Sequence, residues 1–394
     1  MQGRPGPLSR TRLRQETPGC EKVAHLNNAG AGLSPAVVVD RMVHHLQRES
    51  ECGPYEAAHT VADEIRLGRS QVAQVVGVRS DQLAFVESAT AGLHRVLSTI
   101  HLQRGDRVLV SGAEYASTVL PLLQLSHRIG LRVEVIPDDP TGITDADALA
   151  RMLDDDVRLV CVVHAPSHNG LVNDVSALGA ALRAQGSNAW YLVDACQSVG
   201  QLPVDMTEIG ADFLVASGRK YLRGPRGSGI LAVSDRALNE VDAYPLDVAG
   251  ARWAHTDDFT VDSSARRFES FESSVAVTLG LIEAVRYAQS LSIPVLTGAI
   301  GRNAEYLRSH LGATGSWLVQ DRGRQRSGIV TVRHDRIAAS YAVATLRQAG
   351  INAWEVGPHV NPRELDGRAV VRLSPHAYNT TEELDLAVAV LASL

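Results

Sequence analysis

An apolar run, a lysine and a glycine-rich turn follow one another in Asp212-Phe-Leu-Val-Ala-Ser-Gly-Arg-Lys-Tyr-Leu-Arg-Gly-Pro-Arg-Gly-Ser-Gly229. Of the 38 basic residues in the chain, only Lys22 and Lys220 are lysines, and the others are arginines. Only a lysine can lose its proton at an accessible pH and attack a carbonyl carbon. A lysine just after a strand therefore indicates Schiff-base chemistry at Lys220, and the alternative is sequence drift without a function.

Strand-like and helix-like patterns alternate around this segment. Helical spacing is found, for example, in Ala148–Leu153 and Ala177–Arg183, between apolar runs. Such alternation favours a mainly parallel sheet that is covered by helices on both faces. The apolar runs are Arg107–Val110, Val133–Ile136, Val157–Val163, Trp190–Val193, Phe213–Val215 and Gly229–Val233.

The C-terminal part of the chain has strands of its own. Ser274–Leu291 is expected to be a connecting helix, and Gly328–Val332 and Ala369–Leu373 are expected to be strands. A capping signal that begins at Thr380 predicts a final helix. The sequence thus predicts an α/β fold with a large domain over residues 24–262 and a smaller α+β domain formed by residues 1–23 and 263–394 with the connecting helix.

Composition excludes several classes of protein. The net charge of −6 and the pI near 6.2 give no basic surplus for binding nucleic acid or an anionic membrane. No apolar run reaches the roughly 18 residues of a membrane helix, and the N-terminal stretch lacks the apolar core of a secretory signal. The four cysteines show neither a CxxC pair nor a disulfide framework, which predicts a cytoplasmic protein without a metal site.

A second chemical signal is Asp194, at the end of the apolar run that begins at Trp190. Open α/β sheets bind their ligands at the carboxyl ends of the strands. A carboxylate there, opposite Lys220, suits a protonated ring nitrogen, and pyridoxal phosphate needs such a partner to act as an electron sink. The alternative is that Asp194 is only the N-cap of a following helix.

The segment Phe85–Gly92 joins a short apolar strand to a helix. Small hydroxyl residues at a helix N-terminus offer backbone N–H groups to a phosphate, and Ser88, Ala89 and Thr90 are the candidates. Tyr115 follows another strand and is a candidate for stacking on a cofactor face, although a lone tyrosine is usually only a surface residue.

Taken together, these motifs closely resemble the aminotransferase class V family of fold-type I pyridoxal phosphate enzymes. The similarity runs from Leu26-Asn-Asn-Ala-Gly30 to Val371-Arg-Leu-Ser-Pro-His-Ala-Tyr-Asn-Thr380. It implies a cofactor-carrying Lys220, with Asp194 on the pyridine nitrogen. It also implies that Gln197 contacts the ring hydroxyl, that Ser217 and Arg219 contact the phosphate, and that Arg372 holds the substrate carboxylate, with Asn28 a further substrate contact.

This sequence departs from the family pattern at several positions. Val360 stands where the cysteine desulfurases of the family have a mobile cysteine, and no cysteine lies beyond residue 196. Persulfide chemistry is therefore not expected. Ser167 replaces an asparagine that is often near the ring hydroxyl, and the adjacent His168 is a candidate substrate contact or simply a loop histidine. Glu272 stands where a partner-subunit hydroxyl often completes phosphate binding.

The resemblance is nearest to the branch that includes ergothioneine-pathway carbon–sulfur lyases and lincosamide-pathway enzymes, which process cysteine S-conjugates. It implies a homodimer and β-elimination from a cysteine S-conjugate. Transamination, decarboxylating oxidative deamination and epimerisation stay open, because the substrate pose decides which bond breaks. A non-catalytic binding protein of the same fold is a further alternative. A nucleotide-binding protein is disfavoured, because no GxGxxG or Walker A run is found.

Overall fold

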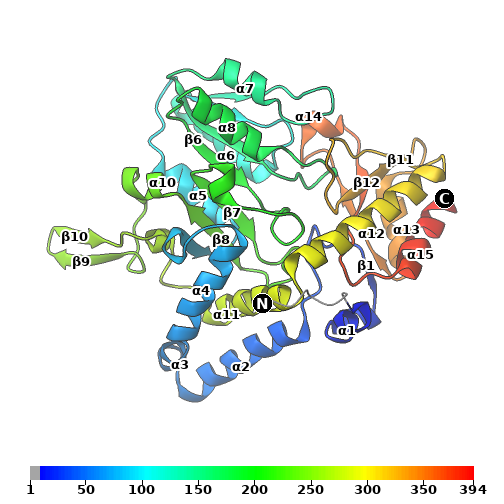
Figure 1. Cartoon of the computed structure of the whole chain (residues 1–394), viewed down its shortest axis with the longest axis horizontal. Coiled ribbons are helices and arrows are strands. Elements are labelled where there is room, and N and C mark those ends of the chain that lie inside the picture. The colour runs from blue at the N-terminus through cyan, green and yellow to red at the C-terminus, as the bar shows by residue number, and fades with distance from the viewer. Residues whose placement is uncertain (1–8) are drawn as a thin grey trace, which may run out of the picture.

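The computed structural model describes residues 9–394, so the first eight residues of the predicted 1–23 segment lie outside it. Its centre is a seven-stranded sheet in which only β8 runs against the other strands (Figure 1). In spatial order the strands are β2 (Leu83–Val86), β8 (Gly229–Val233), β7 (Phe213–Ser217), β6 (Trp190–Asp194), β5 (Val157–Val163), β3 (Arg107–Val110) and β4 (Arg132–Val135). The α/β fold with a mainly parallel sheet is therefore confirmed.

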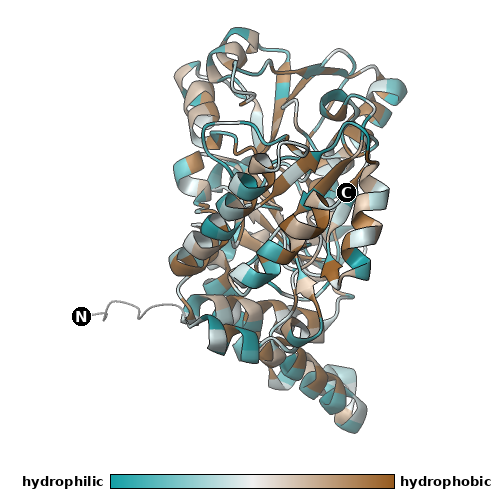
Figure 2. Ribbon diagram, turned by 90° about the vertical axis from the view of Figure 1, so that its right-hand side faces the viewer, coloured by the Kyte–Doolittle hydropathy of each residue, from teal (hydrophilic) through white to brown (hydrophobic). Residues whose placement is uncertain are grey.

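Both faces of this sheet are covered by helices, because its strands alternate between two apolar cores. In β5, Val160 and Val162 pack into one core, whereas Leu159 and Cys161 pack into the other. Figure 2 shows apolar residues concentrated in the strands at the centre of the ribbon. One face packs against α4 (Ala62–Val75), α7 (Ala146–Met152), α8 (Val175–Ala184) and α11 (Val275–Ser290), and the other packs against α5 (Ala89–Thr99), α6 (Ala116–Ile129) and α10 (Asp235–Glu240).

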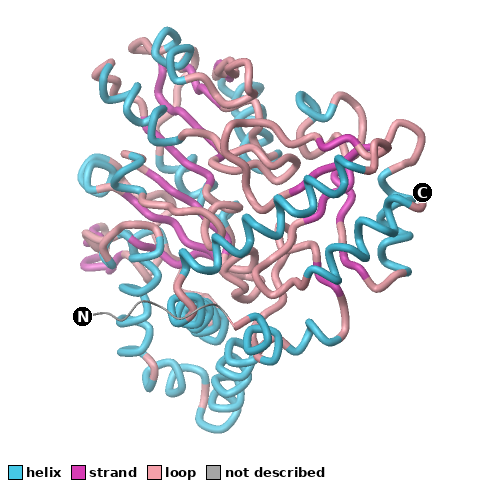
Figure 3. The backbone as a smooth tube through the Cα atoms, turned by 45° about the vertical axis from the view of Figure 1, so that its right-hand side comes forward, coloured by secondary structure: helices cyan, strands magenta, loops and turns pink. Residues whose placement is uncertain are grey.

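A second, antiparallel sheet forms in the C-terminal part, in the order β11 (Leu318–Val319), β12 (Val330–Arg333), β15 (Val370–Leu373) and β14 (Trp354–Val356). Figure 3 shows the two groups of strands, with the long α12 (Ile293–Ala313) between them. The short β1 (Ala24–His25) pairs with β13 (Ile351–Asn352), so residues 24 and 25 bond to the C-terminal part. The domain boundaries given above stay a prediction. The remaining helices around this sheet are α13 (Ala339–Gln348), α14 (Pro362–Leu365) and α15 (Thr381–Ala392).

The sequence patterns did not predict two features. α2 (Ala36–Cys52) and α3 (Pro54–Thr60) form an arm that packs against α11 and α4. The hairpin of β9 (Ala251–His255) and β10 (Asp258–Val261) projects from the body (Figure 1) and is largely exposed, with Trp253 80% exposed. Within residues 9–394, no helix combines the length and the hydrophobicity needed to span a bilayer.

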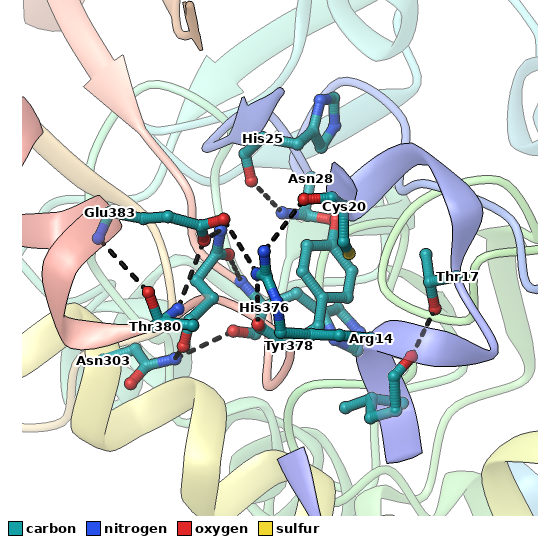
Figure 4. Close-up of polar contacts among 12 residues, drawn as sticks. Arg14, Thr17, Cys20, His25, Asn28, Asn303, His376, Tyr378, Thr380 and Glu383 are labelled. Carbon is teal, nitrogen blue, oxygen red and sulfur yellow. Dashed lines mark hydrogen bonds and ion pairs between the residues drawn. The ribbon is translucent and has the colours of Figure 1, made fainter. Parts of the chain in front are cut away.

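The N-terminal α1 (Arg10–Gln15) is tied to the start of α15, as Figure 4 shows. Arg14 donates to Glu383 Oε1 at 2.8 Å and to the carbonyl oxygen of Tyr378 at 3.1 Å. Glu383 Oε2 accepts the N–H of Thr380, whose hydroxyl oxygen accepts the N–H of Glu383. This reciprocal capping box confirms the predicted start of the final helix.

Because Thr380 caps α15, we expect Thr380→Ala to lower the free energy of unfolding by about 1 kcal/mol. Thr381→Ala is the matched control, since Thr381 is exposed in the first turn and makes no side-chain hydrogen bond in the described part of the chain. Denaturant titration of both variants measures the difference. Equal effects of the two substitutions would contradict the capping role.

Candidate active site

The predicted site residues converge at the carboxyl ends of the parallel strands. Asp194 ends β6, and Ser217 ends β7 three residues before Lys220. Ser88 follows β2, Tyr115 follows β3 and Ser167 follows β5. All ten residues predicted to bind the cofactor line one cavity of ≈ 260 Å³: Ser88, Ala89, Thr90, Tyr115, Ser167, Asp194, Gln197, Ser217, Arg219 and Lys220.

Asp194 and Lys220 lie in the same cavity and are both largely buried, with 9% and 8% of their surfaces exposed. Burial raises the pKa of Asp194, whereas the charge of Lys220 and the N–H of Cys196, which donates to Asp194 Oδ1 at 2.8 Å, act in the opposite direction. No helix begins at Asp194, because the next helix, α9 (Met206–Ile209), is capped by Asp205. The N-cap alternative for Asp194 is therefore wrong.

The other end of the cavity is suited to an anion. The N-terminus of α5 points there, with Ser88 as its N-cap. Ser217 Oγ accepts the N–H of Ala89 at 3.4 Å, while the N–H of Thr90 meets no acceptor in residues 9–394. Arg219 and Arg226 line the same cavity, and neither makes an ion pair in the described part of the chain.

Two further polar groups have unused hydrogen-bonding capacity. Gln197 lines the cavity, whereas Arg372 is not among its lining residues and is linked to it through Ser167. Gln197 donates through Nε2 to the carbonyl of Ala29 at 2.9 Å, and its buried Oε1 has no partner. Arg372 donates to the carbonyl of Ser167 at 2.9 Å and to Asn27 Oδ1 at 3.0 Å, and its Nε has no partner. No carboxylate in residues 9–394 pairs with this buried guanidinium. Burial lowers the pKa of Arg372 to about 10, so it is still a cation at neutral pH.

The structure does not bring two predicted substrate contacts, Asn28 and His168, to the cavity wall. The amide of Asn28 is fully buried, donates to the carbonyl of Ser374 at 2.8 Å and accepts the hydroxyl of Tyr378 at 2.5 Å (Figure 4). His168 Nε2 is 2.8 Å from Glu364 Oε2. Asn28 is thus bonded within the protein, whereas Nδ1 of His168 has no partner in the described residues, and a substrate contact by either residue stays a prediction.

Sequence reasoning missed residues that share the site. Asn27 contacts Arg372, but the Asn27-Asn28 pair gave no signal for choosing between the two asparagines. Arg226 lies in the glycine-rich run after Lys220 and also lines the cavity. Its nearness in sequence to Arg219 was the signal that could have predicted it as a site residue. The family resemblance puts Glu272 at a position where a partner subunit often contacts the phosphate. In the structure both Glu272 and its neighbour Phe271 are exposed.

Glu114 is a second buried carboxyl near Asp194. Its Oε1 accepts the hydroxyl of Ser111 at 2.6 Å and the N–H of Val163 at 2.5 Å, while Oε2 has no partner. Burial raises the pKa of Glu114 to about 7, and the charge of Asp194 acts in the same direction. Near neutral pH, Glu114 is therefore partly protonated, which limits the repulsion between the two carboxyls.

We expect Glu114 to make stability depend on pH. Since its pKa is raised from 4.5 to about 7 in the folded protein, its contribution is complete below 4.5 and is lost as the pH rises through about 7. From pH 5 to pH 8, the wild-type protein should lose about 2–3 kcal/mol more unfolding free energy than Glu114→Gln. Urea denaturation at both pH values measures this. Glu272→Gln, at an exposed position, should follow the wild type; identical pH profiles for Glu114→Gln and the wild type would contradict the assignment.

Comparison with known proteins finds relatives of similar sequence and similar fold. The probable cysteine desulfurase of Methanothermobacter thermautotrophicus is 28% identical over 389 residues, covering 95% of each protein. The apo cysteine desulfurase from Thermococcus onnurineus NA1 superposes with a TM-score of 0.89 at 22% identity, covering 97% of each chain.

Two structures of C-DES have the same fold at 22% identity. One, with glycine covalently linked to its pyridoxal phosphate cofactor, has a TM-score of 0.88 and covers 97% of this chain and 99% of that one. The other, a complex of this cystine C–S lyase with its reaction product cysteine persulfide, has a TM-score of 0.87 and covers 96% and 99%. The family model for aminotransferase class V matches residues 24–386. The chain therefore belongs to the aminotransferase class V family of fold-type I enzymes that depend on pyridoxal phosphate.

Proposed function

We propose that this chain uses pyridoxal phosphate in the described cavity to cleave the carbon–sulfur bond of cysteine S-conjugates by β-elimination. The observation that carries the proposal is one cavity that holds a buried amine, a buried carboxylate and, at its other end, an anion-binding helix terminus. These groups fit the cofactor, and the unpartnered Oε1 of Gln197 fits its ring hydroxyl.

Each residue has a role in this proposal. Lys220 would hold the cofactor through Nζ, and its amine, once freed, would remove the α-proton of the substrate. Asp194 holds a proton on the ring nitrogen, and the N-terminus of α5 with Ser217, Arg219 and Arg226 binds the phosphate. Tyr115, which lines the cavity, would contact the ring. The guanidinium of Arg372, which has no acidic partner in residues 9–394, binds the substrate carboxylate.

The cofactor supplies an electron sink for the bond that breaks at the substrate. In β-elimination the α-proton passes to Lys220 Nζ, the carbon–sulfur bond breaks and the sulfur leaves with its electron pair as a thiolate. Water then converts the remaining three-carbon fragment to pyruvate and ammonia. One molecule of water is consumed for each thiol released.

The segment before Arg372 supports elimination over desulfuration. In this segment Val360 packs against the small apolar cluster of Val356, Leu365 and Val370. A valine there provides no thiolate to accept sulfur. Cys196 lines the cavity at the Asp194 end, where its N–H is hydrogen-bonded to that carboxylate. The curated relative and the solved structures are named for reactions that release sulfur from cysteine or cystine, which supports the same bond as the target.

We also propose a cytoplasmic homodimer. Phe271 and Tyr55 are exposed and stack with ring centroids 6.5 Å apart, and the hairpin exposes Trp253 and Phe259. Exposed aromatic groups of this kind are typical of protein–protein contacts. A second cavity, lined in part by Ser270, Ser273 and Ser274, shares Gly227 and Ser228 with the first, so a partner at this face would lie near the first cavity. All four cysteines are free thiols, which suits a reducing compartment.

S-alkyl and S-aryl L-cysteines should give thiol, pyruvate and ammonia in equal amounts, and L-alanine should give no pyruvate by elimination because it has no β-leaving group. Arg372→Gln should lower kcat/KM by about 30- to 150-fold, since a hydrogen bond to a charged group is worth about 2–3 kcal/mol. The exposed Arg368→Gln is the control. A carbonyl product that retains the sulfur would instead identify transamination or oxidative decarboxylation.

A further inference from the structure

The start of α14 is bonded to two loops of the site. Asn361 is 4% exposed and caps α14, since its Oδ1 accepts the N–H groups of Arg363 and Glu364. Its Nδ2 donates to the carbonyls of Gly112 and Glu114, at 2.9 and 3.1 Å. These bonds fix the loop after β3 to the segment that connects β14 and β15.

Glu364 makes the second set of contacts. Its Oε2 lies 2.8 Å from His168 Nε2 and accepts the amide N–H of Asn169 at 2.7 Å. The side chains of Glu364 and His168 are 7% and 1% exposed. Because a carboxylate only accepts hydrogen bonds, His168 donates through Nε2. Hydrogen bonds from His168 and Asn169 hold the pKa of Glu364 below its usual range despite burial, and the guanidinium of Arg322, 3.8 Å away, adds to this.

One anchored residue in each of the two loops is next in sequence to a residue of the cavity wall. Glu114 precedes Tyr115, and His168 follows Ser167. The carbonyl of Ser167 in turn accepts the guanidinium of Arg372 at 2.9 Å. A chain of contacts therefore runs from Glu364 through His168 and Ser167 to the guanidinium of Arg372, which has no acidic partner in residues 9–394.

We propose that Asn361 and Glu364 form a latch that positions Arg372 for an amino-acid carboxylate. The proposal rests on the proposed function and adds two positioning residues to it. The latch holds the segment that carries Val360 against the large sheet, so the guanidinium is oriented before the substrate arrives. Preorganisation of this kind acts on substrate binding and leaves the proton transfer at Lys220 unaltered.

Glycine and ethylamine separate this role from general structural damage, because both have an amine and only glycine has a carboxylate. In titrations of the holoenzyme followed by cofactor absorbance, Glu364→Ala should weaken glycine binding by about tenfold and leave ethylamine binding unchanged. For an S-alkyl cysteine, KM should rise by a similar factor with kcat retained. Glu364→Gln keeps an acceptor for Asn169 and should restore most of the affinity for glycine.

Asp366→Asn is the matched control, since Asp366 is an exposed carboxylate two residues away that makes no ion pair in the described part of the chain. Asn361→Ser is the second variant. It tests whether the latch positions Arg372 if Glu364→Ala does not retain the cofactor. Serine still caps α14 but cannot donate to Gly112 and Glu114 as the amide does, so the same selective loss of glycine binding is expected.

Two results would overturn the latch. One is unchanged glycine affinity in Glu364→Ala or in Asn361→Ser. The other is an equal loss of glycine and ethylamine binding, which would indicate damage to the whole site. A wild-type spectrum that does not respond to glycine would instead contradict the proposed function, and the latch with it.

Discussion

The burial of Asp194 and Lys220 in one cavity is the constraint on which the rest of the site depends. Taking either charge out of water alone is costly, and each offsets part of the cost for the other. The parallel strands make this proximity possible, because β6 and β7 are neighbours and end at the same edge of the sheet. The two apolar cores, one on each face, hold those strand ends in register.

The C-terminal part completes the site from outside the large sheet. Arg372 comes from β15, in the centre of the smaller sheet, yet its hydrogen bonds reach Ser167 and Asn27. An arginine that crosses between the two sheets must be oriented by contacts on both sides. In this view the smaller sheet is part of the substrate-binding apparatus, and the short α14 is the place where its position relative to the large sheet is set.

The central sheet could be predicted from sequence because its strands are buried on both faces. Arg107–Val110, Val157–Val163 and Gly229–Val233 were predicted with the bounds that the structure has, and the run expected at Val133 begins one residue earlier. The hairpin at Ala251–Val261 gave no such signal. Its side chains are exposed on both faces, so no apolar alternation marks it.

The chemistry of the site was likewise predictable only in part. Residue type and position after a strand pointed to Lys220 and Asp194, because few side chains can form a Schiff base or hold a proton on a ring nitrogen, whereas Arg372 was predicted only from the family resemblance. By contrast, His168 is a plausible substrate contact from its type alone, and only the distant Glu364 shows that the ring is already bonded. A contact between residues 196 positions apart in the chain has no local signature in either segment. Sequence likewise could not show which of Asn27 and Asn28 contacts Arg372. Hydrogen bonds between distant segments decide it, because Asn27 bonds to Arg372 and Asn28 bonds to Tyr378.

The presence of only two lysines allows a direct test of the central claim. Borohydride reduction of the holoenzyme, followed by proteolysis and mass spectrometry, should find the cofactor mass on the peptide that contains Lys220 and leave the Lys22 peptide unmodified. Lys22→Ala should keep the visible absorbance band, and Lys220→Ala should abolish it. Label on Lys22, or a band that survives in Lys220→Ala, would contradict the account.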